Sequence, residues 1–471
     1  MVAESMLPSA GIATPGTAAG RAILRRAFML LWLSDTAFDL GAALMSFALG
    51  VWIFQLTGSA AQFSIAVVAA ALPGLLLAPL AGALADRFDR RWLIAGCDIA
   101  SVLMIGTLAL LLSQQRLTVT CLYVFNAAAG IVVAVRSPAY SASLGAVVPS
   151  DRLTQASGLL GLTQSGLQVG APLLAGYIMG SAGLEGVVAI EMVLAVAGAV
   201  AAFNALSRVG HAIRGMQADA RLSLMQATAA SFQAALRYFK DAPLMAVLAA
   251  YGVLNDSLIA LAAAMMTPLV LSTHSSTVLG TILTGGALGG ALGSALLLVA
   301  RVNRRLMLWV LLANAGLALF VMLLGLPIPP PALCACAFLA LLCGSAARGC
   351  AFALWIRKTP PANRGSILAL LGSLGLLMTC VMVLGGGSLG EHLFEPALAA
   401  EGAWAQSAIG AWLGTGKGRG LGFLFTACGA ASLVISLLAL AHGRLRRLDE
   451  LVFDQPGESS RLRACAQAIA S

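Results

Sequence analysis

Long apolar stretches dominate the chain and are separated by short polar joints. Each stretch is about 20 residues or longer, enough for an α-helix to cross the roughly 30 Å hydrocarbon layer of a membrane. Few stretches alternate strictly between apolar and polar residues, as strands of a membrane β-barrel do, so helices are favoured. We therefore predict an all-α membrane protein with twelve transmembrane helices, at 28–54, 61–84, 92–113, 118–143, 155–180, 185–207, 244–271, 276–299, 306–326, 332–355, 366–389 and 419–441.

The longest polar stretch before the last helix, residues 208–243, separates two sets of six predicted helices. Apolar residues recur in it among basic ones, which predicts an amphipathic helix on the membrane surface. The first apolar run is too long for a signal peptide, so we expect it to stay uncleaved. The expected parts are a cytoplasmic tail at 1–27, a six-helix bundle at 28–207, a cytoplasmic linker at 208–243, a second six-helix bundle at 244–441 and a cytoplasmic tail at 442–471.

Composition and charge support a membrane protein and predict its orientation. Only 10% of the 471 residues are charged and 60% are apolar, whereas soluble domains carry about 25% charged residues. Of the 28 lysines and arginines, 23 fall in joints and tails on one side of the predicted helices, three on the other side and two inside helices. Because basic residues collect on the cytoplasmic side, both termini are predicted to be cytoplasmic in a bacterial inner membrane. The net charge of +9 then reflects topology, and the short joints offer no basic groove for nucleic acid.

The two halves of the chain repeat the same charged landmarks. Each has an acid in its first predicted helix, Asp39 or Asp256, and an Arg-Arg pair after its second. Each also has an arginine late in its fourth helix, Arg136 or Arg348. The acid precedes the end of the Arg-Arg pair by 52 residues in the first half and by 49 in the second. Such matching offsets indicate duplicated six-helix halves related by an axis along the membrane normal.

One joint carries the motif of a known family. The segment Gly82-Ala-Leu-Ala-Asp86-Arg87-Phe-Asp89-Arg90-Arg91 closely resembles the signature loop between helices 2 and 3 of the major facilitator superfamily, with Asp89 where the family usually has glycine. Segments 47–54 with 56–59, 138–141 and 394–396 are similar to the drug and siderophore exporter branch, which includes macrolide-efflux and enterobactin-exporter proteins. The resemblance implies the major facilitator fold, with two bundles that alternate access to a central cavity, and transport without a cofactor.

The resemblance also implies roles for two groups of motif residues. The carboxylate of Asp86 would face the start of helix 11, where exposed amides and the helix dipole favour negative charge. The neighbouring arginines would close a cytoplasmic gate with acids on other helices; alternatively, they only enforce topology. The candidate gate residues are Asp86, Arg87, Arg90, Arg91 and Asp98. The stretch 166–176 is similar to the antiporter motif of helix 5, with Gly166, Gly170, Pro172 and Gly176 as its candidate residues.

Ionisable residues inside the predicted helices are the strongest candidates for the transport site: Asp35, Asp39, Arg136, Asp256 and Arg348. Each costs about 2.5–3.5 kcal/mol at a helix centre, so each is expected to face a cavity and to have a partner. Asp35 and Asp39 share one helix face, and Asp35 matches the depth of Arg136 better. In the superfamily, helices 1, 4, 7 and 10 line the cavity, so we expect pairs between the acids and the arginines. Glu191 either lines the outer half of the cavity or packs near the interface.

Two interpretations of these pairs remain open. In one, an acid loses its arginine as the halves rock and takes up a proton, which drives export of a siderophore, secondary metabolite or drug. In the other, the pairs are permanent and hold helices together. An importer or lipid flippase of the same fold, or a membrane receptor or scaffold, is the alternative function. The sequence contains no nucleophile arrangement or metal-ligand spacing, so we expect no enzyme activity, cofactor or metal. The expected partners are substrate, protons and lipid around a monomer.

Overall fold

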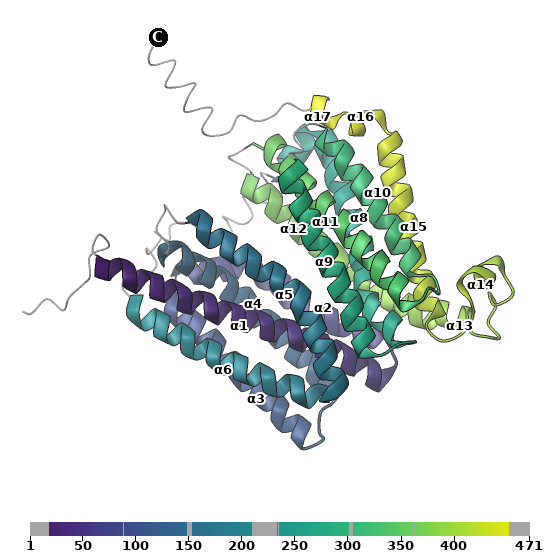
Figure 1. Cartoon of the computed structure of the whole chain (residues 1–471). Helices are drawn as coiled ribbons and strands as arrows, with labels where there is room; N and C mark the ends of the chain where they lie inside the picture. Colours follow the sequence, from purple (N-terminus) through teal and green to yellow (C-terminus); the bar gives the residue numbers. More distant parts are fainter. Residues whose placement is uncertain are drawn as a thin grey trace, which may run out of the picture.

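The computed structural model describes residues 18–87, 89–147, 153–209, 233, 235–300, 305–360 and 364–451. Most of the predicted amphipathic linker helix and the ends of both predicted tails lie outside these residues. Twelve long helices run through the described part (Figure 1). They are α1 (Ala18–Thr57), α2 (Ala60–Arg87), α3 (Arg90–Ser113), α4 (Val119–Val147), α5 (Leu153–Ser181), α6 (Gly183–Val209), α8 (Pro243–Leu271), α9 (Ser276–Ala300), α10 (Leu306–Leu324), α11 (Pro330–Lys358), α12 (Arg364–Leu389) and α15 (Arg419–Ala441).

Eleven of these helices contain segments long and apolar enough to cross a membrane, and the described residues include no strand. In α5 the apolar segment found is the shorter Val169–Ser181. Helices are favoured in lipid because they satisfy every backbone hydrogen bond internally. The predicted all-α membrane fold is thus confirmed. The main difference in boundaries is that α1 begins at Ala18, before the predicted start at residue 28.

The helices form two bundles that meet at one end of the molecule. In the first bundle α1 packs against α6 and α2 against α4; in the second, α11 packs against α9 and α10. Between the bundles, α5 packs against α9 and α2 against α12. Figure 1 shows the bundles diverging toward the end where α1 begins. We call this the open end, and the opposite end, where α1 ends and α2 begins, the closed end.

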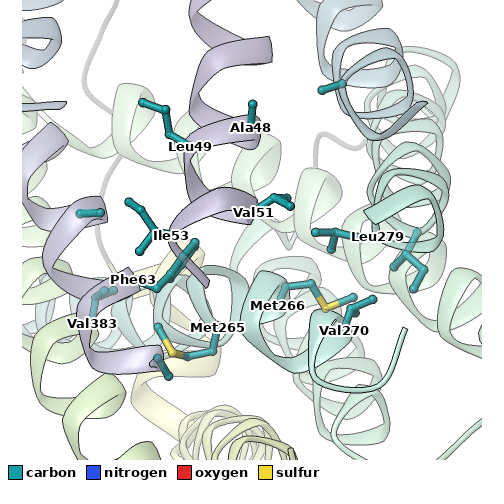
Figure 2. Close-up of a cluster of buried hydrophobic side chains, with 14 of the residues drawn as sticks. Ala48, Leu49, Val51, Ile53, Phe63, Met265, Met266, Val270, Leu279 and Val383 are labelled. Carbon is teal, nitrogen blue, oxygen red and sulfur yellow. The ribbon is translucent and has the colours of Figure 1, made fainter. Parts of the chain in front are cut away.

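The buried apolar residues follow the same division. At the closed end a single cluster joins residues of both bundles. Figure 2 shows part of it, with Ala48, Leu49, Val51, Ile53 and Phe63 from the first bundle and Met265, Met266, Val270, Leu279 and Val383 from the second. Toward the open end, the described residues form separate clusters within the bundles, one in the first bundle and two in the second. Among the described residues, apolar packing therefore holds the two bundles together at the closed end.

Two features at the closed end bring the bundles into close contact. A Cβ atom on Gly176 of α5 would lie 2.9 Å from the carbonyl oxygen of Ser276 and 3.0 Å from Cα of Gly280 on α9. Only glycine allows the helices to approach this closely. Nearby, the Glu391 carboxylate accepts hydrogen bonds from Ser59 Oγ and from the backbone N–H of Ala61, 2.8 Å away, at the start of α2.

The segment between α12 and α15 contains short helices that the sequence analysis does not predict. These are a π-helical turn, η2 (Gly390–Phe394), followed by α13 (Glu395–Ala397) and α14 (Ala408–Leu413). Phe423 of α15 packs edge-on against Phe394 and Trp404, with ring centroids 4.9 and 5.4 Å away. After α15, the short helices α16 (Gly443–Arg446) and α17 (Leu448–Leu451) cover the open end of the second bundle, where Leu445 and Leu448 are buried.

Candidate functional site

A buried arginine between two carboxylates forms the centre of the candidate site. Arg136 of α4 is 2% exposed. Its Nη1 donates to Asp35 Oδ1 on α1 at 2.7 Å, and its Nε donates to Asp98 Oδ1 on α3 at 2.8 Å. Its Nη2 donates to Ser34 Oγ at 3.2 Å. The guanidinium thus uses its planar fork to connect three helices of the first bundle.

The surroundings of Arg136 stabilise its positive charge further. Its Cζ lies 4.1 Å from the ring centroid of Phe38 and 5.7 Å from that of Tyr140, distances at which aromatic faces attract a cation. The Oδ2 atom of Asp98 has no hydrogen-bond partner among the described residues. Because two carboxylates share one guanidinium, the site carries one unbalanced negative charge unless one acid is protonated. Such a site can accept a proton or a cationic group.

Asp39 lies one turn beyond Asp35 on α1 and has a different partner. Gln164 of α5 donates its side-chain amide to Asp39 Oδ2. At the same interface the Trp32 indole donates to Thr163 Oγ1 at 3.0 Å. The polar face of α1 therefore contacts α4 through Asp35 and α5 through Asp39. Asp35 was predicted as the partner of Arg136 because the two residues lie at similar depths in their helices, and this geometry agrees with that prediction.

The second bundle does not repeat this arrangement. Asp256 on α8 and Arg348 on α11 are both exposed, and the charge of Arg348 acts on Asp256. Within the described residues, however, these two side chains form no ion pair. Asn255, the residue before Asp256 on α8, is hydrogen-bonded to α15 instead: Ser432 Oγ donates to Asn255 Oδ1 at 2.6 Å. The predicted pair is thus formed in the first bundle and absent from the second in this conformation.

A cavity of about 670 Å³ lies beside the Arg136 cluster, inside the first bundle. Its lining residues come from α1, α2, α3, α4 and α6 and are mostly small and apolar. Phe38, which packs on Arg136, lines it, as do Ser46 and Asn126. The resemblance to the superfamily predicts a central cavity between the two bundles. This cavity instead has no lining residue from the second bundle.

The candidate gate residues whose side chains are described do not form a single cluster. Arg91 pairs with Asp89 at 2.6 Å, and Asp89 also caps α3 by accepting from the Arg91 backbone N–H. Asp98 was predicted with the gate, but it lies in the buried cluster on Arg136 instead. Arg90 begins α3. Asp86 and Arg87 end α2, and their side chains lie outside the described part of the structure.

The antiporter-like stretch on α5 has two different surroundings. Gly176 packs against Gly280 of α9, and a Cβ atom on Gly280 would lie 2.8 Å from the carbonyl oxygen of Pro172. A Cβ atom on Gly166 or Gly170 would meet nothing within 4 Å. The second half of the stretch therefore forms part of the bundle interface, while the first half faces open space.

Glu191 of α6 lines the same cavity and is only 9% exposed. Of the two positions predicted for Glu191, lining the cavity or packing near the interface, the structure has the first. The signal that identifies it is the one that identified Asp35 and Arg136, an ionisable side chain within an apolar helix. Glu191 lies on α6, whereas the resemblance to the superfamily predicts that helices 1, 4, 7 and 10 line the cavity.

Comparisons with known proteins agree with this architecture. Macrolide efflux protein A of Streptococcus pyogenes is 25% identical over 169 residues, which cover 36% of this chain and 42% of that relative. The match thus spans less than half of the relative's length. A variant of the nucleoside transporter NupG has a TM-score of 0.62 at 14% identity, covering 89% of this chain and 99% of that chain. A bacterial homologue of the iron transporter ferroportin, in an inward-facing state, has a TM-score of 0.60 at 16% identity, covering 88% and 98%.

These structural likenesses show a transporter fold, and the family follows from the sequence itself. The family model of the Major Facilitator Superfamily matches residues 31–383, about three quarters of the chain. The chain therefore belongs to the Major Facilitator Superfamily and is a multi-pass membrane protein with the fold of a transporter.

Proposed function

We propose that this protein exports a small molecule from the bacterial cytoplasm by alternating access, in exchange for protons. The observation that carries this proposal is the buried Arg136 cluster beside a cavity at membrane depth. Apolar lining next to charged groups suits a substrate with an apolar body and polar or charged substituents. Drugs, siderophores and secondary metabolites have this character, and the relative named for macrolide efflux supports export.

The open end is the cytoplasmic end in this proposal. Arg26, Arg91, Arg305, Arg357 and Arg444 lie there, whereas the closed end carries Arg116, Lys417 and Arg419. Basic residues collect on the cytoplasmic side of membrane proteins, so both termini are cytoplasmic and the conformation is inward-facing. The substrate enters from the cytoplasm and leaves after the bundles separate at the closed end and meet at the open end.

Proton exchange follows from the arrangement of Asp35, Asp98 and Arg136. In the inward-facing conformation the guanidinium binds both carboxylates. When the helices shift toward the outward-facing conformation, one carboxylate loses the guanidinium and takes a proton from the outside, because an unpaired buried carboxylate is costly. On return, the guanidinium binds that carboxylate again and displaces the proton to the cytoplasm. Asp39 and Asp256, which have no arginine bound, are further proton or substrate sites.

Transport in proteoliposomes tests this function. The probe is a radiolabelled macrolide, and an imposed pH gradient supplies the driving force. We expect uphill flux with the wild type, loss of that flux with Asp35→Asn, and weaker flux with Asp39→Asn and Asp256→Asn. Flux that persists in all three variants contradicts proton coupling through these acids, and flux in the opposite direction under the same gradient favours import. If the macrolide is not moved, siderophores are the next substrate class to test.

A further inference from the structure

Glu191 is a buried acid that the cluster around Arg136 does not use. Its side chain lines the cavity, and its Oε2 atom has no hydrogen-bond partner among the described residues. On α1 it faces Gly41, where a Cβ atom would lie 2.7 Å from Oε2. The absence of a side chain at Gly41 therefore leaves room for the carboxyl group.

The charged groups on the helices around Glu191 are engaged elsewhere. On α1, Asp35 binds Arg136 and Asp39 accepts from Gln164. On α3, Asp98 also binds Arg136, and Cys97 precedes it in the sequence. On α4, Arg136 is bound by both acids and Tyr140 lies against it; on α5, Tyr177 is exposed. No charged side chain among the described residues acts on Glu191.

A carboxylate in this place would be an unpaired buried charge. The cost of such a charge is several kcal/mol, and a carboxyl group avoids it by binding a proton. Glu191 therefore differs from Asp35 and Asp98, whose negative charges are offset by a guanidinium. In the conformation described, we therefore expect Glu191 to be neutral and the Arg136 cluster to hold one carboxylate in excess.

The cavity extends from Glu191 to Phe38, which packs on the Arg136 guanidinium. Gly198 of α6 packs against Ser34 and Ala37 of α1, which places the Arg136 cluster seven residues beyond Glu191, or about 10 Å along the helix. Glu191 lies about 12 Å from the end of α6 at the closed end. Four polar side chains also line this cavity: Ser46, Ser101, Asn126 and Ser137. A cavity of about 670 Å³ with such groups has room for several hydrogen-bonded waters.

We propose that Glu191 is the outer proton acceptor of the transport cycle and passes its proton through this cavity to the carboxylates around Arg136. This inference rests on the proposed proton-coupled function. In the outward-facing conformation Glu191 takes a proton from the outside. In that same conformation the neutral acid releases the proton to water in the cavity, and the carboxylate of Asp35 or Asp98 that has lost the guanidinium accepts it. Glu191 then takes a second proton from the outside, so it is neutral again when the bundles return to the inward-facing conformation.

The first test needs no substrate. Infrared spectra of the full chain in lipid nanodiscs at neutral pH are compared between wild type and Glu191→Gln. We expect the variant to lose the carbonyl stretch of one neutral carboxylic acid, and the matched control Glu185→Gln, an exposed glutamate on the same helix, to leave that band unchanged. Loss of a carboxylate band instead overturns the inference. Glu191→Met, which has similar volume and cannot titrate, serves if Glu191→Gln does not fold.

The second test separates coupling from transport. In proteoliposomes with the macrolide probe, Glu191→Gln should reduce pH-driven uphill flux roughly tenfold or more, while exchange of labelled for unlabelled probe without a gradient continues. Glu191→Asp should restore part of the pH-driven flux. If Glu191→Gln keeps wild-type pH-driven flux while Asp35→Asn loses it, this inference fails and the proposed function stands. If the wild type shows no pH-driven flux, proton coupling fails, and the relay through Glu191 fails with it.

Discussion

At the scale of single residues, Arg136 shows how the first bundle keeps charge inside the membrane. A buried guanidinium is stabilised only if its donors are satisfied and opposite charges are near. Here Asp35, Asp98 and Ser34 satisfy three donors, and Phe38 covers the guanidinium face. A lysine has one point charge and cannot bind three acceptors in this planar geometry. The cluster therefore requires arginine.

Stability should depend on the charge balance around Arg136. Arg136→Met leaves two buried carboxylates without a cation and should lower the free energy of unfolding by about 3 kcal/mol or more. Adding Asp98→Asn to this variant should restore part of the loss, because one negative charge is removed. The measurement is thermal unfolding in detergent of the single and double variants. Equal stability of Arg136→Met and wild type would contradict the account of a charge-balanced site.

At the scale of elements, glycine positions distinguish helix faces that touch from those that do not. Gly176 and Gly170 belong to the same predicted motif on α5, yet only Gly176 lies against α9. A Cβ atom at Gly176 must displace backbone atoms of α9, and shifts of that kind typically cost about 1–3 kcal/mol. At Gly170 the new methyl group meets open space, and alanine favours a helix by roughly 0.8–1 kcal/mol over glycine.

The pair Gly176→Ala and Gly170→Ala tests the α5–α9 interface. We expect Gly176→Ala to lower the unfolding temperature and Gly170→Ala to leave it equal or slightly higher. The same comparison in the transport assay should show reduced flux only for Gly176→Ala. Identical behaviour of the two variants would mean that α5 and α9 do not pack closely at Gly176.

For this protein, the long helices could be predicted from the sequence, whereas some side-chain partners and the short helices could not. Hydrophobicity and helix length predicted all twelve long helices, because lipid imposes one backbone solution. The partner of Asp98 was not predictable, because it depends on how α3 and α4 are rotated against each other. The short helices at 390–413 were missed because they are too short to produce an apolar run. The absence of an Asp256–Arg348 pair depends on the conformation, which no local pattern encodes.

At the scale of the whole molecule, the contacts that connect the described parts of the two bundles bias the choice of conformation. The Glu391 carboxylate belongs to the second bundle and accepts from Ser59 Oγ and the Ala61 N–H of the first. It therefore lies at the N-terminus of α2, where negative charge is favoured. Separation of the bundles at the closed end must break this contact. Glu391 thus stabilises the conformation in which the closed end stays closed.

Loss of that carboxylate should shift the conformational equilibrium. A hydrogen bond to a charged group contributes about 1.5–3 kcal/mol, so Glu391→Gln should raise the outward-facing population roughly tenfold or more relative to the inward-facing one. Spin labels at Gln114 and Thr273, exposed positions at the closed end of the two bundles, report this as a larger share of long distances in a background without native cysteines. The matched control is Glu401→Gln, an exposed glutamate in the same segment. An unchanged distance distribution in Glu391→Gln would mean that the apolar cluster alone holds the closed end together, because the charged contact would then contribute nothing to the balance between conformations.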